Sequence, residues 1–230
     1  MPNTNLVVAV NPESVNTETI NVEKRKLVKI QPIRDNSNMR VVNIIGMAPS
    51  ANVTLPYGEN WCINHSWCYG NKPNKLFIMD GLAAMHKEAE VEGFSFTDFI
   101  KFIENNPDIE VINALPEPLS LDGKIIFTCK EFPLAETLKL LPGTFVNNSI
   151  SHALMYAAVQ EQLGYKKVDV INLVGVELWT SFDKSEYEYQ RPNVDFWIPF
   201  LYGKGIQINV PAYLLYAKDT KKNLYGYIRS

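Results

Sequence analysis

VVNIIGMAPS, from Val41 to Ser50, is the stretch that decides the fold of this chain. Its apolar run, interrupted by Asn43, stops at Gly46, and a short run of this kind between turn residues is typical of a strand buried on both faces of a parallel sheet. Glycine permits a tight turn, and Pro49 with Ser50 favours the start of a short helix or turn. Because backbone N–H groups at such a turn can hold phosphate, the stretch predicts a phosphate-binding site. An ordinary strand followed by a proline turn is the competing interpretation.

Two common phosphate loops do not match this stretch. The Walker pattern requires Gly-Lys followed by Ser or Thr, and this tripeptide occurs nowhere in the chain. The dinucleotide fingerprint requires three glycines, whereas Met47, Ala48 and Ala51 follow Gly46. The sequence therefore argues against NAD or ATP binding through these two loops.

Composition and charge favour one globular domain. The chain has 230 residues, 46% of them hydrophobic and 20% charged, which is enough to bury a substantial core. The net charge of -3 and the pI near 5.7 disfavour nucleic acid as a partner, although a local basic groove is compatible with them. Cys62, Cys68 and Cys129 lack the spacing of a metal site, so free thiols are expected. No apolar run approaches the roughly 18 residues of a membrane span, and a signal-peptide core is lacking, so we expect a cytoplasmic protein.

The chain reads as an N-terminal arm, residues 1–38, followed by one domain, residues 39–230. A basic KRKLVK cluster in the arm, Lys24 to Lys29, is either a phosphate contact or the solvated face of an edge strand. Strand-like and helix-like segments then alternate, which predicts a Rossmann-like α/β fold with a mostly parallel sheet flanked by helices. Strands are expected at 41–45, 61–64, 75–80, 110–113, 124–128, 168–174 and 206–210, with a Pro-rich loop at 116–122. Helices are expected at 82–91, after Ser95, and at 132–140, 147–164 and 192–202, with Ser149 or Ser151 as the N-cap of the helix at 147–164.

Polar side chains follow several of the predicted strands. Asn64 and Asp80 end two of them, and Glu177 lies two residues beyond Gly175 after a third. In open α/β sheets ligands bind at the carboxyl ends of the strands, so we expect these side chains to converge on a ligand. The polar and aromatic segment at 179–191 predicts a long loop of the kind that often acts as a lid or binding segment.

With these pieces in order, the chain resembles a group of single-domain Rossmann-like enzymes that includes bacterial sialyltransferases using CMP-activated sugars. In that group a first strand ends in a Gly-x-Gly-Pro-Ser loop, a second in Asn and a third in Asn or Asp. A Ser/Thr-capped helix then runs to LGY-K before a strand that ends in Gly-x-Asp. The counterparts in this chain are Gly46 to Ser50, Asn64, Asp80, Ser149 to Ser151, LGYKK at Leu163 to Lys167, and Gly175-Val176-Glu177. The resemblance covers most of residues 41–180 and implies a nucleotide-sugar donor.

The chain departs from that pattern at three points. The group places a catalytic histidine downstream of the Gly-x-Asp strand, whereas this chain has no histidine after His152. Ala48 stands for the second glycine of the loop, and Met47 stands at its Asn position. The general base is therefore unassigned, and sialyl transfer itself is not carried over.

The chain is also similar to uncharacterised phage-encoded proteins that have an Ala-Pro-Ser loop, a Tyr-Glu-Tyr-Gln-Arg-Pro segment and a Tyr-Gly-Tyr ending. The matching segments are Tyr187 to Pro192 and Tyr225 to Tyr227. This resemblance implies a phage setting, and therefore the host cytoplasm, but no chemistry.

Sugar transfer from a nucleotide needs a grip on the leaving phosphate, a base for the acceptor hydroxyl and stabilisation of developing positive charge. The candidate catalytic residues are Glu177, Asp183 and His65, since a buried carboxylate or a histidine at the ligand rim can take a proton. The candidate nucleotide- and donor-binding residues are Gly46, Ala48, Pro49, Ser50, Asn64, Asp80, Ser149, Ser151, Gly175, Tyr189 and Arg191. A structural role, as strand-end cap, loop charge or packed side chain, is the competing interpretation for each. His152, in the first turn of the clearest helix, is either a site residue or a locally bonded one.

The leading prediction is a nucleotide-sugar-dependent glycosyltransferase with a small nucleotide ligand, no certain cofactor and no metal site. One alternative is a Mg-dependent phosphotransferase or diphosphokinase in which Asp80 and Glu177 hold the ion. The other is a non-catalytic nucleotide-binding protein, which the missing downstream histidine favours. The acceptor, the donor sugar and the oligomeric state are not encoded in any pattern that the sequence shows.

Overall fold

The computed structural model describes residues 38–52, 55, 57–79, 95–114, 118–121, 124–140, 145–178 and 184–210. The chain divides after residue 37, and every described residue belongs to the second unit, Asn38–Ser230. Apart from Asn38, the predicted arm lies outside the described residues, as do Asp80, Asp183 and the helix expected at 82–91.

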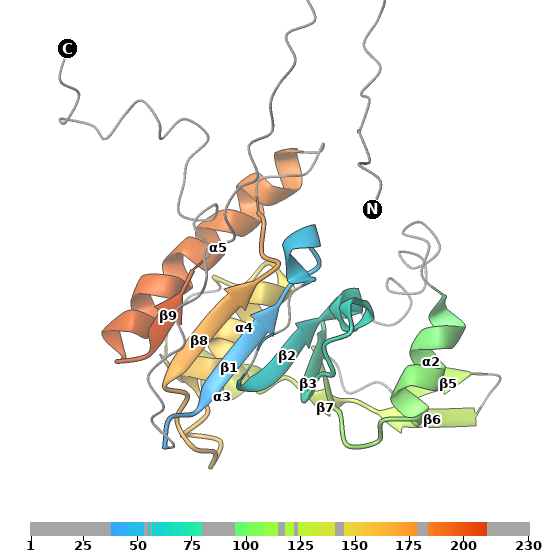
Figure 1. Cartoon of the computed structure of the whole chain (residues 1–230). Helices are drawn as coiled ribbons and strands as arrows, with labels where there is room; N and C mark the ends of the chain where they lie inside the picture. The colour runs from blue at the N-terminus through green and yellow to red at the C-terminus, as the bar shows by residue number, and fades with distance from the viewer. Residues whose placement is uncertain are drawn as a thin grey trace, which may run out of the picture. The chain divides into compact units, whose positions relative to one another are not determined.

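Within the described residues, seven strands form one parallel sheet in the order β7-β4-β3-β2-β1-β8-β9 (Figure 1). Their bounds are β1 Val41–Ile45, β2 Glu59–Ile63, β3 Lys75–Ile78, β4 Glu110–Asn113, β7 Lys130–Glu131, β8 Val170–Val174 and β9 Gln207–Asn209. Every position of β1 and of β8 is buried, as expected of central strands covered on both faces. The predicted Rossmann-like α/β fold, with a parallel sheet flanked by helices, is confirmed.

The order of the strands creates a switch in direction beside β1. From β1 the chain adds β2, β3, β4 and β7 on one side and then returns to place β8 and β9 on the other side. In open parallel sheets the crevice outside the carboxyl ends of the strands at such a switch is where ligands bind. We therefore expect a ligand to bind beside the segments that follow β1 and β8.

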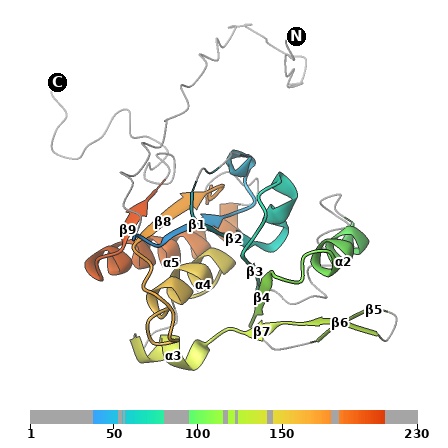
Figure 2. The same cartoon turned by 60° about the horizontal axis from the view of Figure 1, so that its bottom comes forward.

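Helices cover the two faces of this sheet. Helices α4 (Ser149–Ala158) and α5 (Lys184–Gly203) lie over one face, where Val42 and Ile44 belong to the larger core (Figure 2). Helix α2 (Phe96–Glu104) lies over the other face, in the core that contains Ile45. Helix α3 (Leu134–Leu140) contacts α4. Helices α4 and α5 thus share one side of the sheet.

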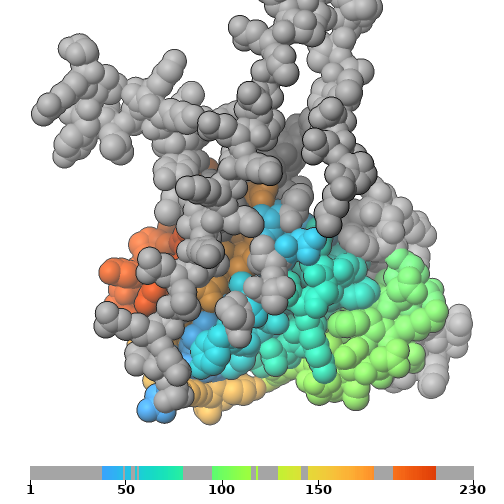
Figure 3. All heavy atoms as spheres, in the orientation of Figure 1, coloured from blue at the N-terminus to red at the C-terminus, as the bar shows by residue number. Residues whose placement is uncertain are grey.

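Helix α2 begins where the sequence predicted. It packs against a short 3-10 helix, η2, on the same face of the sheet. The Ser95 side chain accepts the Asp98 N–H at 3.2 Å, which caps α2. Trp67 of η2 (Asn64–Tyr69) stacks on Phe102 of α2, with ring centroids 4.4 Å apart. The turquoise atoms of η2 and the green atoms of α2 adjoin in Figure 3.

Three predictions, about a cap, a helix start and a loop, were wrong, and the helix expected at 147–164 ends at Ala158. The N-cap of α4 is Asn148, whose side chain accepts the Ser151 N–H, and neither Ser149 nor Ser151 caps the helix. Helix α5 begins at Lys184 and not at Pro192, so the second half of the predicted 179–191 loop is helical. The predicted Pro-rich loop contains strand β5 (Pro118–Leu121), which pairs antiparallel with β6 (Lys124–Thr128) beside α2.

An asparagine ladder crosses four neighbouring strands. Asn43 of β1 lies in register with Asn60 of β2 and Asn172 of β8, which lies in register with Asn209 of β9. The Asn43 amide donates to Asn60 Oδ1 at 3.0 Å, the Asn172 amide to Asn43 Oδ1 at 2.7 Å and the Asn209 amide to Asn172 Oδ1 at 2.7 Å. Asn43 is 1% exposed, so hydrogen bonding compensates its burial. The one polar residue of the β1 run is therefore part of a shared network.

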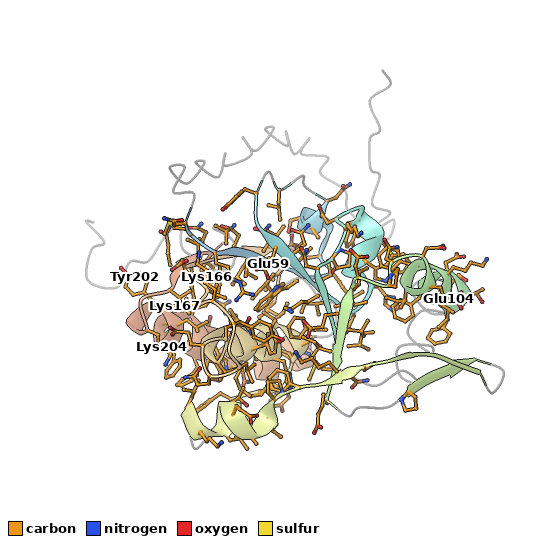
Figure 4. The ribbon with its side chains drawn as sticks, turned by 90° about the horizontal axis from the view of Figure 1, so that it is seen from below. Glu59, Glu104, Lys166, Lys167, Tyr202 and Lys204 are labelled. Carbon is orange, nitrogen blue, oxygen red and sulfur yellow. The ribbon has the colours of Figure 1, made fainter. Side chains whose placement is uncertain are left out.

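Charged side chains gather at the opposite, amino-terminal edge of the sheet, which Figure 4 shows from below. Arg40 donates two hydrogen bonds to the Glu59 carboxylate, from Nε to Oε1 at 2.6 Å and from Nη2 to Oε2 at 3.0 Å. Trp61 Nε1 donates to the same carboxylate. Arg40 also donates its backbone N–H to Asp169 Oδ2 at 2.7 Å and so ties β1 to the start of β8. A bidentate pair of this kind fixes strand ends with geometric specificity.

Two lysines share one carboxylate at the same edge. Lys75 forms an ion pair with Glu110, and Lys130 Nζ lies 2.6 Å from Glu110 Oε1 and 2.6 Å from the hydroxyl oxygen of Tyr165. Burial of the ammonium group, and after it the positive charge of Lys130, lower the pKa of Lys75 to about 8 from its ordinary 10.5. Glu110 is thus the carboxylate that pairs with both of these neighbouring lysines.

Replacing Glu110 by glutamine should destabilise the fold by about 2 kcal/mol at pH 7, because the buried Lys75 then keeps its charge without the carboxylate that pairs with it. The loss of unfolding free energy relative to wild type should be smaller at pH 9. Since the folded pKa of Lys75 lies below its unfolded value, the unfolded chain binds more protons between about pH 8 and 10.5, and the free energy of unfolding rises with pH there. Urea unfolding of both proteins at pH 7 and 9 measures this. An equal or larger deficit at pH 9 would contradict it, and the double variant Lys75→Met/Glu110→Gln should lose most of the pH dependence.

Candidate functional site

The carboxyl ends of β1 and β8 meet through two glycines. The Gly46 N–H donates to Val174 O at 2.8 Å, and the Ala48 N–H donates to Gly175 O at 3.0 Å. A Cβ on Gly46 would lie 2.4 Å from Gly175 O. Gly175 has φ +63, and a Cβ there would lie 2.4 Å from Ala51 Cβ. Only glycine satisfies both the contact and the left-handed backbone, so the switch point is built from bare backbone.

The loop after β1 is held by its neighbours. Ser50 is half-buried in a short 3-10 turn, η1 (Pro49–Ala51), in which the Ala51 N–H donates to Ala48 O at 2.8 Å. Tyr69 donates its hydroxyl to Met47 O at 2.6 Å, and the Asn71 amide donates to Ala51 O at 3.3 Å. The N–H groups of Ala48 and Ala51, both expected to face phosphate, are thus bonded within the protein. Hydrogen bonds to neighbouring segments thus hold the backbone of this loop at the carboxyl edge of the sheet.

Asn64 follows β2 at the same edge and has an unusual backbone. Among the described residues it is the one non-glycine residue with a positive φ, 46°. Asparagine tolerates this left-handed conformation better than most residues, and such strain clusters at functional sites. The next residue, His65, is 1% exposed, and Ser66 Oγ accepts the Ile63 N–H at 2.9 Å. The structure therefore places Asn64, half-buried, at the end of β2 and His65 inside the protein.

The first turn of α4 is held by Asn148 and not by the predicted serines. Asn148 Oδ1 accepts the Ser151 N–H at 2.7 Å and the Ser151 hydroxyl at 2.9 Å. Ser149 and Ser151 are both buried, at 8% and 0% exposed. Asparagine is among the strongest N-cap residues, so the spacing of Asn148 and Ser151 is the sequence signal that could have found this cap.

The first turns of α5 lie against the start of α4. The Asn147 amide donates to Tyr189 O at 2.5 Å, and the Asn148 amide donates to Gln190 O at 3.0 Å. Arg191 pairs with Asp195 at 3.3 Å, and Tyr189 is 71% exposed. Because a helix between parallel strands runs opposite to them, both helix starts lie toward the carboxyl edge of the sheet. Figure 1 shows the first turns of α5 (orange) on the side of η1. The start of α4, which contains Ser149 and Ser151, thus lies against the part of α5 that contains Tyr189 and Arg191.

His152 completes this region. Its Nδ1 lies 3.0 Å from Asn148 O, so this nitrogen carries the proton that the carbonyl accepts. Its ring meets Phe132 edge to face, with centroids 5.0 Å apart. The local bond supports the structural interpretation of His152 and leaves the ligand-contact one as a prediction.

The remaining predicted residues divide between the crevice and the parts of the chain that are not described. Glu177 is half-buried two residues after Gly175, on the β8 side of the crevice. Asp80 and Asp183 lie outside the described residues, as does the side chain of Pro49. Among the residues that the structure covers, no three His, Cys, Asp or Glu side chains gather as a metal site would need. In the same residues no helix combines the length and the apolar character required to traverse a bilayer.

No family model matches the chain, and no curated protein matches it. Among solved structures, the chain is similar to the sialyltransferase CstII from Campylobacter jejuni, solved in complex with the substrate analogue CMP-3FNeuAc. The two chains are 15% identical, and the alignment covers 76% of this chain and 87% of that one with a TM-score of 0.34.

Proposed function

We propose that the chain is a nucleotide-sugar-dependent glycosyltransferase that binds its donor across the carboxyl edge of the sheet. The observation that carries this proposal is the switch in strand order between β1 and β8, the place where open parallel sheets bind ligands; there the Gly46 and Gly175 contact brings the two strand ends together. The sequence resemblance to enzymes that use CMP-activated sugars supports the choice of a nucleotide sugar. A phage setting, implied by the second resemblance, remains part of the proposal.

The residues around the crevice have chemistry that fits the parts of such a reaction. Asn64 offers an amide to the hydroxyls of ribose or sugar, and Arg191 offers positive charge to the phosphate. Glu177, half-buried shortly after β8, has a carboxylate that suits the role of base for an acceptor hydroxyl. Asp183 and Asp80 keep their proposed roles as an alternative base and a donor contact. His65 fits a proton-transfer role less well because it is buried.

Ligand binding is tested by thermal shift with nucleoside mono- and diphosphates and with CMP-, UDP- and GDP-sugars, with and without Mg. A true ligand at 100 times its Kd should stabilise the wild-type protein by about 2.7 kcal/mol. Asn64→Gly keeps the left-handed backbone and removes the amide, so it should weaken binding at least tenfold. Asn64→Ala should in addition lower stability by about 1 kcal/mol.

The outcomes separate the alternatives. If no nucleotide or nucleotide sugar stabilises the wild-type protein, or if Asn64→Gly binds as well as wild type, the proposed site is wrong. Release of free nucleotide from a bound nucleotide sugar with acceptor mixtures identifies a transferase, whereas binding without release identifies a nucleotide-binding protein. Stabilisation that requires Mg would favour the phosphotransferase.

A further inference from the structure

One side chain connects two helix starts. Asn148 uses its oxygen to cap α4, at 2.7 Å from the Ser151 N–H, and its amide nitrogen to bind Gln190 O of α5 at 3.0 Å. Asn147 adds a second donor, to Tyr189 O at 2.5 Å. The amide plane fixes both ends of Asn148 together, so the side chain cannot rotate away from Gln190 and still cap α4 unchanged.

Helix α5 changes character at Pro192. A proline inside a helix has no N–H for the carbonyl four residues earlier, which here is that of Glu188, and its ring disfavours that turn. Beyond the proline, Val194, Trp197 and Leu201 are all 0% exposed, and Trp197 Nε1 donates to Phe145 O at 2.7 Å. Before the proline, Tyr189 is 71% exposed. The core thus anchors the later turns. The bonds to Asn147 and Asn148 tie the earlier turns to α4, and two bonds cross Pro192, from the Asn193 amide to Tyr189 O at 3.0 Å and from Arg191 to Asp195 at 3.3 Å.

We propose that residues Lys184–Arg191, the flap, open as a unit at Pro192, and that Asn148 couples this opening to the N-terminal cap of α4. The Asn148 and Asn147 amides are the latch: while both bind the carbonyls of α5, the flap stays closed. The flap carries Tyr189 and Arg191, so its opening changes access to the carboxyl edge of the sheet. The latch itself is a property of the free protein and does not depend on the proposed glycosyltransferase activity.

Amide hydrogen exchange on the unliganded full chain tests the latch. Asn148→Asp keeps a capping oxygen for Ser151 but cannot donate to Gln190 O, so it should speed exchange at 187–191 about tenfold, the effect of losing one hydrogen bond. Amides at 194–201 and in the first turn of α4 should exchange as in wild type. Adding Asn147→Ala, which removes the second donor, should raise the effect at 187–191 further. Pro192→Ala restores a donor for Glu188 O and should slow exchange there.

Asn148→Ala is the matched control, because it loses the cap and the latch together and should speed exchange in both helix starts. The proposal is overturned if Asn148→Asp leaves exchange at 187–191 unchanged. It is also overturned if the acceleration spreads equally over 194–201, which would indicate loosening of the whole helix. If amide exchange at 187–191 were unchanged in Pro192→Ala, the proposed hinge at Pro192 would be contradicted. None of these measurements requires a ligand, so they test the latch independently of the proposed glycosyltransferase activity.

Discussion

Gly175→Ala is expected to lower the free energy of unfolding by about 3 kcal/mol. The left-handed backbone at φ +63 costs an alanine about 1 kcal/mol. The added Cβ would also lie 2.4 Å from Ala51 Cβ and 2.9 Å from Gly46 O, and relieving that overlap requires the two loops at the switch to separate, at about 1–3 kcal/mol. Urea unfolding measures the loss. Ligand binding at the crevice should be lost in the same variant.

Gly70→Ala is the control for the backbone term. Gly70 has φ +84, and a Cβ there would meet no atom within 4 Å, so the substitution carries the conformational cost without the overlap. A loss of about 1 kcal/mol is expected for it. If Gly70→Ala and Gly175→Ala lost equal stability, the close approach of β1 and β8 would not be what requires glycine.

Asn43→Leu is expected to cost about 3 kcal/mol, although leucine has a similar shape. The substitution leaves Asn60 Oδ1 and the Asn172 amide without their ladder partners in a buried setting, and each orphaned group costs about 1–3 kcal/mol. Equilibrium unfolding in urea measures the change, with Ile45→Val in the same strand as a conservative comparison expected to lose about 1 kcal/mol.

The double variant Asn43→Leu/Asn172→Leu distinguishes a ladder from separate polar contacts. Within the ladder, each single change orphans one group on either side of the changed residue, four in all, whereas the double change orphans two of these, Asn60 Oδ1 and the Asn209 amide. The double variant should therefore lose about as much stability as one single variant. Additive losses would show that the asparagines act independently.

The elements that local patterns specify were predictable. The run from Val41 to Ile45 is apolar because both faces of β1 are covered, and its glycine ending marked the turn. The Val170–Val174 strand carries the same signal, and Ser95 was identified as a cap because the residue type itself forms the bond. These features depend on neighbours in sequence, so the parallel α/β class could be derived from them.

Features that depend on partners distant in sequence were not predictable. Nothing near Asn43 indicates that Asn172, 129 positions away, completes its hydrogen bonds. Pro192 suggested a helix start because proline favours the first turn, but the helix begins at Lys184 and tolerates the proline inside it. The pairing of Asn148 with Gln190 likewise exists only after α4 and α5 pack together.

The candidate site was predictable in its location and less so in its details. The carboxyl edge follows from the fold class, and Asn64, Ser50 and Glu177 do lie after strands that share that edge. The orientation of individual groups depends on tertiary packing, which buries His65 and engages the Ala48 N–H with Gly175 O. Residue type alone could not reveal either fact.

The asparagine ladder also has a consequence for how the sheet assembles. Side chains alternate between the faces of a strand, so sliding β8 by a single position against β1 would turn Asn172 toward the apolar side and break its amide contact with Asn43. A misaligned strand would then bury polar groups that no neighbour can satisfy. The row of amides thus favours one register of these four strands. Their aliphatic residues alone would tolerate other registers.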